Sequence, residues 1–426
     1  MKKFLSMLLA TVVMCVSLAF VGCKKGDENF SLSGVVSNGG LGVIKDGYLY
    51  YINGVTTELE TEVEQVITST SIFKRKVDAN GNPVAGSEPQ VVYRGVAGFA
   101  KSSLHIFGDY IYFAVPSTKV SNSATRLSKR TSFARIGLDG KNFEVLYTTE
   151  TEDALKYEYY AVSDTEMHLV VLEGTELYSL NLAKKKIKKN TISTEVESAV
   201  FTSTNGRGNG AEAYVFYTKA PASTYLTQNG NIVYKATPDG KINSRISSGE
   251  SIKLLEINGG NLFFTANNKI YKSTTAAGLD KSNIVSYNAY TKYLLPEDGG
   301  IIGVDETNSK TVKVEWENGE LVEATRIIND KSYTLMLENG TYLIGYNSSK
   351  VIYAAALNGT TVTPKKLTDD KIASADGYLT YEIFGDYLYF YAEKTVKDSN
   401  GNDLKIKSLT TLNISEAYNK VESSSK

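Results

Sequence analysis

The sequence predicts an all-β fold and, within that class, a β-propeller built from four-stranded antiparallel blades. Three observations lead to this prediction. A phrase made of a tight Gly or Asp turn and a Tyr-rich apolar strand occurs eight times, its copies are 40 to 61 residues apart, and most copies are followed by a strand that ends in Asp-Gly or Asn-Gly. A period of this length is typical of propeller blades. Eight blades are favoured, and seven are the alternative if one degenerate copy is an insertion.

The first phrase is clearest at residues 46–51, 108–113 and 385–390, which read DGYLYY, GDYIYF and GDYLYF. Short apolar runs bounded by Gly, Asn and Asp indicate strands that are buried on both faces, and stacked blades bury most strands in this way. The turns that begin the eight copies lie near Gly47, Gly108, Asp164, Gly210, Gly260, Gly300, Gly340 and Gly385.

The second phrase is an alternating strand that closes with Asp139-Gly140, Asp239-Gly240 or Asn358-Gly359. These dipeptides adopt the positive φ angles that a two-residue hairpin needs. Each unit is therefore expected to contain two antiparallel hairpins, which together make one blade. The 29 Tyr residues agree with this interpretation, because Tyr favours strands over helices.

Together, the two phrases resemble the Tyr-rich repeats of uncharacterised β-propeller lipoproteins from Gram-positive bacteria. The resemblance covers nearly all of residues 40–415. The copies at Asp164 and Gly300 are degenerate, and the Arg of the second phrase is retained only as Arg75 and Arg135. The resemblance implies a fold and an extracytoplasmic location, and the family brings no agreed activity.

The N-terminus is typical of a secretory signal. Lys2 and Lys3 form a basic start, residues 4–20 are mainly apolar, and Val21-Gly22-Cys23 resembles a bacterial lipobox. In this interpretation residues 1–22 are a lipoprotein signal peptide, and Cys23 carries a diacylglycerol that holds the protein on the extracytoplasmic face of the cell membrane. Phe20 stands where the lipobox usually has Leu, so ordinary signal cleavage and an uncleaved anchor remain alternatives.

The mature chain divides into three parts. Residues 23–39 hold the lipidated Cys and a short tether, residues 40–415 form the propeller, and residues 416–426 are a polar tail that is expected to fray. The last repeat is one strand short. The segment 30–36 could supply this closing strand and hide two open edges.

The sequence indicates no catalytic residue, no metal and no cofactor. Its two histidines, His105 and His168, lie in apolar strands and are expected to be core or interface residues. A Ser-His-Asp triad is possible in principle, but no Gly-x-Ser-x-Gly elbow supports it. Residues 78–82 and 398–403 alternate oxygen-bearing side chains as a Ca²⁺ loop does, yet Asn-Gly hairpin turns explain both segments without a metal.

Candidate contact surfaces lie where the repeat is interrupted. Polar, Ser-, Thr- and Gly-rich insertions are expected at residues 117–129, 191–210 and 218–229. They are candidate contact sites, because propellers place binding contacts on such loops. The Lys-rich run 184–189 could touch teichoic acid, phospholipid headgroups or an acidic partner, or it could be a solvated hairpin. Trp316 beside a turn could be an exposed aromatic contact.

A net charge of −1 argues against nucleic acid as a partner. The most favoured function is a membrane-anchored binding or interaction module for an unknown protein or glycan ligand. The alternatives are an extracytoplasmic carbohydrate-active enzyme and a sensor or assembly factor of an envelope complex. An enzyme should gather several carboxylates with Tyr or His in one deep pocket, whereas a binding module should present a broad, Tyr-lined rim.

Overall fold

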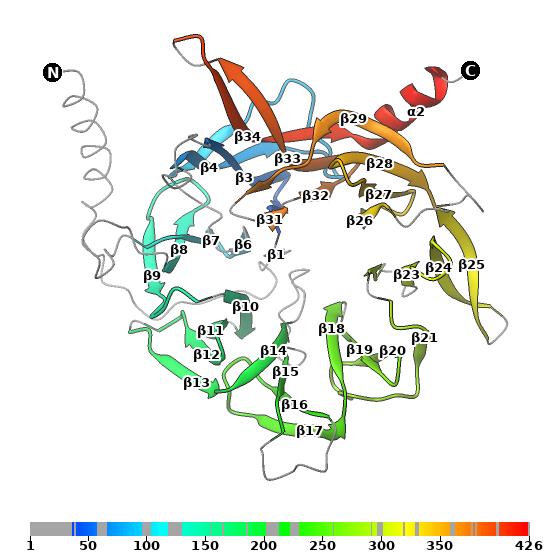
Figure 1. Cartoon of the computed structure of the whole chain (residues 1–426). Coiled ribbons are helices and arrows are strands. Elements are labelled where there is room, and N and C mark those ends of the chain that lie inside the picture. Colours follow the sequence, from blue (N-terminus) through cyan, green and yellow to red (C-terminus); the bar gives the residue numbers. More distant parts are fainter. Residues whose placement is uncertain are drawn as a thin grey trace.

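The computed structural model is an eight-bladed β-propeller whose blades follow one another around a ring (Figure 1). This confirms the predicted fold class and the favoured blade number. The structure describes residues 36–37, 40–57, 66–95, 104–117, 130–153, 155–163, 166–184, 186–201, 213–221, 230–258, 260–290, 292–295, 301–317, 320–328, 332–357, 363–375, 378–379, 381–397 and 400–424. The predicted signal peptide and Cys23 lie outside these residues.

Each blade is an antiparallel sheet whose strands follow the chain from the central channel outward. Blades 1 to 4 comprise β2 (Gly42–Lys45), β3 (Tyr48–Thr57), β4 (Val66–Lys76) and β5 (Gln90–Arg94); β6 (His105–Phe107), β7 (Tyr110–Pro116), β8 (Thr131–Gly137) and β9 (Glu144–Thr148); β10 (Leu155–Ser163), β11 (Glu166–Glu173), β12 (Glu176–Asn181) and β13 (Lys189–Ser193); and β14 (Val196–Phe201), β15 (Val215–Lys219), β16 (Asn231–Ala236) and β17 (Asn243–Glu250).

Blades 5 to 8 comprise β18 (Lys253–Asn258), β19 (Asn261–Ala266), β20 (Lys269–Thr274) and β21 (Ile284–Ser286); β22 (Tyr293–Leu294), β23 (Ile301–Asp305), β24 (Lys310–Glu317) and β25 (Glu320–Ile328); β26 (Thr334–Glu338), β27 (Tyr342–Tyr346), β28 (Val351–Ala356) and β29 (Lys365–Lys371); and β32 (Tyr381–Phe384), β33 (Tyr387–Lys397) and β34 (Asp403–Asn413). A two-stranded ribbon, β30 (Ser374–Ala375) and β31 (Tyr378–Leu379), precedes blade 8.

The five predicted repeat starts that the structure describes lie in turns between the first and second strands of a blade, while Asp164, Gly210 and Gly300 lie outside the described residues. The described glycines there occupy the left-handed region, as the turn chemistry requires, with φ of 57° at Gly108 and 60° at Gly385. The second phrase forms the third strand and its turn into the fourth, where Gly140 and Gly240 also have positive φ.

The core consists of layers between neighbouring blades, so that a single strand serves two layers. In β11, Leu169 packs with Phe133 of blade 2, while Val170 on the opposite face packs with Val215 of blade 4. Both faces of the strand are therefore buried. This explains why the strands are continuous apolar runs and do not alternate with polar residues.

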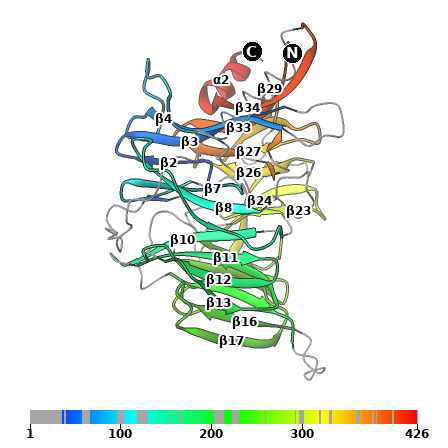
Figure 2. The ribbon, with the colours of Figure 1, turned by 90° about the vertical axis from the view of Figure 1, so that its left-hand side faces the viewer.

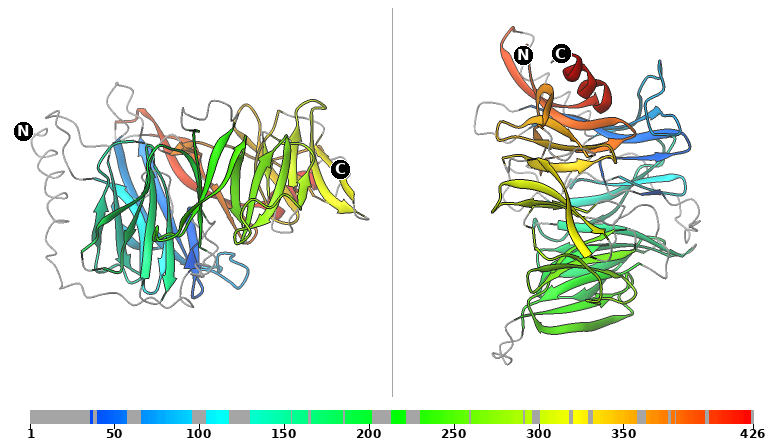
Figure 3. Two further views of the ribbon diagram at one scale, coloured as in Figure 1. Left: turned by 90° about the horizontal axis from the view of Figure 1, so that it is seen from below. Right: turned by 90° about the vertical axis from the view of Figure 1, so that its right-hand side faces the viewer.

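The ring has two faces. The turns between strands 1 and 2 and between strands 3 and 4 of each blade lie at one face, and the remaining connections lie at the other. We call the end that bears turns such as Gly108-Asp109 and Gly385-Asp386 the turn face. We call the opposite end the arm face, because β3–β4 and β33–β34 run beyond the blades there. Figures 2 and 3 show β33 and β34 rising past their neighbours.

The ring closes where these two long hairpins meet. The missing fourth strand of blade 8 is β3, which pairs antiparallel with β34 from Val55 opposite Ser408 to Thr57 opposite Ile406. The prediction that residues 30–36 supply this strand is wrong for the part that the structure describes. β1 (Val36–Ser37) pairs instead with the channel-side edge of β6 in blade 2. Among the described residues no other strand pairs with that edge of β6, whereas β3 already pairs with residues 406–408 of β34.

The C-terminal segment is a helix, α2 (Ile414–Ser424), beside β29 and β34 (Figure 1). The expectation of a frayed polar tail is therefore wrong. The side-chain oxygen of Asn413 caps the helix by accepting the Glu416 N–H at 2.8 Å. Ile414 and Tyr418 are buried against blades 7 and 8, and the Tyr418 ring lies 4.6 Å from that of Tyr342. No helix in the described part of the chain is long and apolar enough to cross a bilayer.

Candidate functional site

His105 lies in the wall between blades 2 and 3. Its ring is 4.6 Å from that of Tyr159, its Nδ1 is 3.4 Å from Glu158 Oε1, and only 1% of the residue is exposed. Burial lowers the pKa of His105 to about 3, so the imidazole is neutral at physiological pH. His105 is thus an interface histidine, as the sequence indicated, and no substrate can reach it.

His168 joins a Ser-His-Glu arrangement on two neighbouring strands of blade 3. Its Nδ1 is 2.7 Å from Ser179 Oγ and its Nε2 is 3.1 Å from Glu166 Oε1. These distances match those of a nucleophile, base and orienting acid. However, Ser179 is 1% exposed and His168 is 5% exposed. A carbonyl group cannot approach Ser179, so the arrangement acts as a buried polar link inside the blade.

A second buried carboxylate ties blade 2 to blade 3. Glu173 accepts hydrogen bonds from Thr151 N at 2.6 Å, from Thr151 Oγ1 at 2.7 Å and from the Tyr178 hydroxyl at 2.7 Å. Burial and the Glu173 charge hold the pKa of Tyr178 well above its usual range. Three donors satisfy the carboxylate, so it stabilises the contact between the blades and is not presented to a ligand.

The Lys-rich run lies at the turn between β12 and β13, on the turn face. Lys184, Lys186 and Lys188 are exposed. The Lys189 ammonium donates to Glu150 at 3.0 Å and to Glu176 at 2.8 Å. The run therefore has exposed lysines that can meet an anionic surface beside a lysine held by two carboxylates.

Glu256 is a half-buried carboxylate on an inner strand of the ring. It lies on β18, the innermost strand of blade 5, and burial raises its pKa. Tyr293 lies on the innermost strand of blade 6, where burial and the Glu256 charge raise its pKa as well. A protonatable carboxyl beside a phenol is a feature that a hydrolase or lyase could use.

The first Ca²⁺-like segment is a hydrogen-bonded turn. The Asp78 carboxylate accepts the Asn80 N–H at 2.9 Å, the Asn82 N–H at 2.8 Å and the Asn82 side-chain amide at 3.2 Å. In the second segment, Lys397 and Asp403 form an ion pair across the end of the β33–β34 hairpin, while residues 398–399 lie outside the described part. Nowhere among the described residues do three His, Cys, Asp or Glu side chains gather for a metal.

The arm face carries the clearest exposed aromatic contact. Tyr287 follows β21, is 53% exposed, and lies with its ring 5.4 Å from the Lys269 ammonium. The adjoining turn is fixed by Ser286, whose hydroxyl donates to Asn288 O at 2.9 Å and accepts the Asn288 N–H at 3.0 Å. Nothing in the repeat pattern distinguishes Tyr287 from the other 28 of the 29 tyrosines. Its position after the fourth strand of a blade, outside the repeated phrases, was the available signal.

The predicted insertions have different outcomes. Those at 117–129 and 218–229 follow strands that end at the arm face, although residues 118–129 and 222–229 lie outside the described part. The third, 191–210, is largely not a loop, because it contains the end of β13 and all of β14 up to Phe201; residues 202–210 are not described. Trp316 lies in β24 opposite Leu321, and its side chain is outside the described part.

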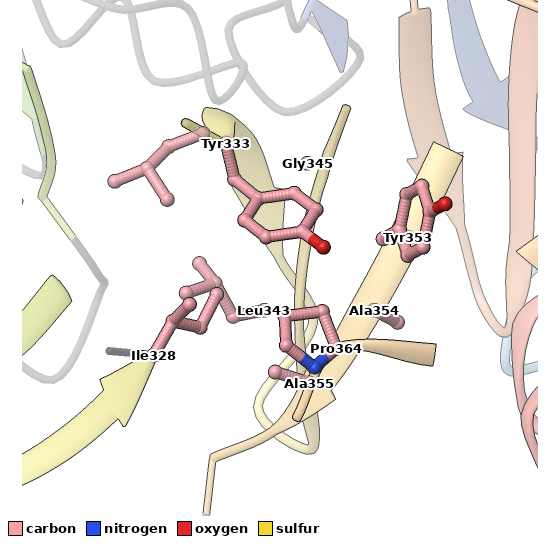
Figure 4. A pocket seen from close by; sticks show the side chains of 9 residues that line it. Ile328, Tyr333, Leu343, Gly345, Tyr353, Ala354, Ala355 and Pro364 are labelled. Carbon is pink, nitrogen blue, oxygen red and sulfur yellow. The ribbon is translucent and has the colours of Figure 1, made fainter. Parts of the chain in front are cut away.

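Between blades 6 and 7 lies an apolar hollow whose empty volume is about 200 Å³, open solvent included. Figure 4 shows the Tyr333 ring lying across it near Pro364, with Leu343 and Ile328 beside it. Ligand pockets usually measure roughly 300–1,000 Å³ and combine apolar walls with several converging polar groups. The hollow is smaller than this and is a packing gap between blades.

No protein-family model matches the chain, and no curated protein matches its sequence. Solved structures with a similar course include the C-terminal WD40 domain of Sif2, at 8% identity and a TM-score of 0.45 over 92% of this chain and 100% of that one. An oligogalacturonate lyase in complex with manganese is 11% identical, with a TM-score of 0.39 over 66% of this chain and 83% of that one. A prolyl endopeptidase is 11% identical, with a TM-score of 0.39 over 88% of this chain. This chain spans only 53% of the length of that protein. At these values the neighbours carry no argument about function.

Proposed function

We propose that the protein is a membrane-anchored extracytoplasmic lipoprotein whose propeller binds a protein or glycan ligand through the arm face. One contrast carries this proposal. The histidines and the carboxylates of Glu158 and Glu173 are engaged inside the blades, while Tyr287 is exposed beside a cation. An amphipathic ring on a fixed turn can stack on a sugar or anchor a partner protein.

The lipid anchor rests on the N-terminal pattern. Cys23 follows an apolar signal and stands before the polar residues Lys24 and Lys25. Two acyl chains on one cysteine are sufficient for stable membrane attachment. Metabolic labelling with a fatty-acid analogue should mark the wild-type protein, and Cys23→Ala should abolish the label. Equal labelling of both would contradict the anchor.

The binding role is tested by applying the purified chain from residue 24 onward to an array of bacterial envelope glycans. In a second experiment, a photo-crosslinker at position 287 of the full-length protein is activated on intact cells. Tyr287→Ala should weaken binding by about tenfold or more, the usual effect of removing a central aromatic contact. Ile242→Ala is the matched control, because Ile242 is 58% exposed but lies at the turn face. Equal losses in both variants, or none in Tyr287→Ala, would overturn the assignment.

A carbohydrate-active enzyme is the second candidate, favoured by Glu256 and Tyr293 on the innermost strands of blades 5 and 6. Glycoside hydrolysis normally needs two carboxyl groups on either side of the scissile bond. Product release from any polysaccharide of the same array, lost in Glu256→Gln, would support this candidate over the binding module. A crosslinked envelope protein with no glycan binding would instead support a sensor or assembly role.

A further inference from the structure

We propose that the turn face of the propeller lies toward the membrane and that the arm face is directed away from it. The proposal rests on lipidation of Cys23 and concerns how the anchored ring is oriented. It starts from the place where the N-terminal chain enters the ring, which is marked by β1 on the inner edge of β6.

The direction of β1 is fixed by its register. Val36 lies opposite Ile106 and Ser37 lies opposite His105, so β1 runs antiparallel to β6. Since β6 runs toward the Gly108-Asp109 turn, β1 runs from the turn face toward the arm face. Gly40 O then accepts the Leu104 N–H at 2.9 Å, beyond the other end of β6. The backbone therefore enters β1 at Val36 from the turn face.

The tether is too short to reverse this orientation by a route around the outside of the ring. Cys23 precedes Val36 by 13 positions, which span at most about 45 Å when fully extended. A route around the outside must cross a four-stranded blade, roughly 15–20 Å wide, and then the length of its strands, roughly 20–25 Å. Such a route uses the whole tether merely to reach the edge of the arm face, so it cannot lay that face against a bilayer.

One cluster of exposed lysines fits the same orientation. Lys184, Lys186 and Lys188 project from the β12–β13 turn on the turn face, where the anionic headgroups of the membrane would attract them. Tyr287 and the ends of β33 and β34 lie at the other face and would be open to an extracytoplasmic partner.

The test uses single cysteines, because the mature chain has no other thiol once Cys23 is acylated. Asp109→Cys marks the turn face and Ser348→Cys marks the arm face, and both positions are exposed turn residues. Each full-length lipidated variant carries a fluorophore in vesicles of phosphatidylglycerol and phosphatidylethanolamine that contain a headgroup-labelled nitroxide lipid as quencher. The label at position 109 should lose most of its fluorescence, and the label at 348 should keep it.

Equal quenching at both positions, quenching only at 348, or none at either would overturn the orientation. Failure of the anchor itself gives a different result, because the protein would then lack the acyl mass at Cys23 and would not float with the vesicles. Adding Cys23→Ala to each labelled variant supplies that control and should abolish both flotation and quenching.

Discussion

The side-chain oxygen of Asn82 accepts a hydrogen bond from the backbone N–H of Asp386 at 2.9 Å, across 304 positions of sequence. The Asp386 carboxylate in turn accepts the Ser415 N–H at 3.2 Å and the Ser415 hydroxyl at 2.9 Å. A loop of blade 1, the first turn of blade 8 and the start of α2 are thereby joined. This contact closes the ring at the turn face, while the pairing of β3 with β34 closes it toward the arm face.

The closure contact depends on a glycine. A Cβ added at Gly385 would lie 2.3 Å from Asn82 Oδ1 and 2.5 Å from Asn80 O. Gly385→Ala should therefore cost roughly 2–4 kcal/mol of unfolding free energy, from the left-handed backbone and the overlap together. Gly108→Ala is the control, because Gly108 has φ of 57° with nothing within 4 Å of the added Cβ, and should cost about 1 kcal/mol. Chemical denaturation measures both, and equal costs would contradict this account of closure.

A second prediction concerns acid stability. The folded state keeps His105 neutral with a pKa of about 3, whereas an unfolded His has a pKa of about 6.5. The contribution of His105 to stability is fully present at pH values above its unfolded-state pKa. It is lost as the pH falls toward its folded-state pKa. Between about pH 6 and pH 4, this one group should lower the unfolding free energy by about 1.4 kcal/mol per pH unit.

His105→Gln removes this proton uptake and leaves the other groups in place. Denaturation curves at several pH values should show a shallower decline for the variant over that range. Parallel declines for the two proteins would mean that His105 does not stay neutral on folding.

Glu256 should show the opposite dependence. Burial raises the pKa of its carboxyl, so the folded state favours the protonated form. Its contribution is present below the unfolded pKa and is lost as pH rises through the folded pKa. Glu256→Gln should therefore melt at a higher temperature than the wild type at pH 7, and the difference should vanish below about pH 4. A variant that is less stable than the wild type at pH 7 would contradict the conclusion that burial raises the pKa of Glu256.

The helix at the C-terminus gives a fourth prediction. Ile414 is fully buried, so Ile414→Ala should cost about 2–4 kcal/mol. Asn419→Ala on the exposed side of the same helix should change stability by no more than about 0.5 kcal/mol. Thermal denaturation of the two variants distinguishes a docked helix from a frayed tail, in which both substitutions would be nearly neutral.

The features that could be predicted from sequence are local ones. Gly108 and Gly140 mark turns because positive φ is a property of the residue and its neighbours, and a run such as Val170–Leu172 is apolar on both faces because blades stack. Closure could not be predicted, since the Asn82–Asp386 bond joins segments far apart in sequence. The helix α2 was readable from the spacing of Ile414, Ala417, Tyr418 and Val421, but the polar composition of the tail concealed it.

The candidate site was less predictable for a related reason. His168, Ser179 and Glu166 meet through strand register, which a single sequence does not show. Burial then decides that this arrangement is structural, and burial depends on the neighbouring blades. Tyr287 differs from the other tyrosines by its exposure, which is likewise set by the assembled ring.

The central claim is that the propeller binds its ligand at the arm face and does not transform it. The most direct measurement uses one envelope polysaccharide to which the protein binds on the glycan array. The polysaccharide is incubated with wild-type protein, Tyr287→Ala or Glu256→Gln, and bound protein and released product are recorded from the same samples. We predict saturable binding by the wild type and Glu256→Gln, strongly weakened binding by Tyr287→Ala, and no product from any of them. Product released by the wild type and lost in Glu256→Gln would contradict the claim.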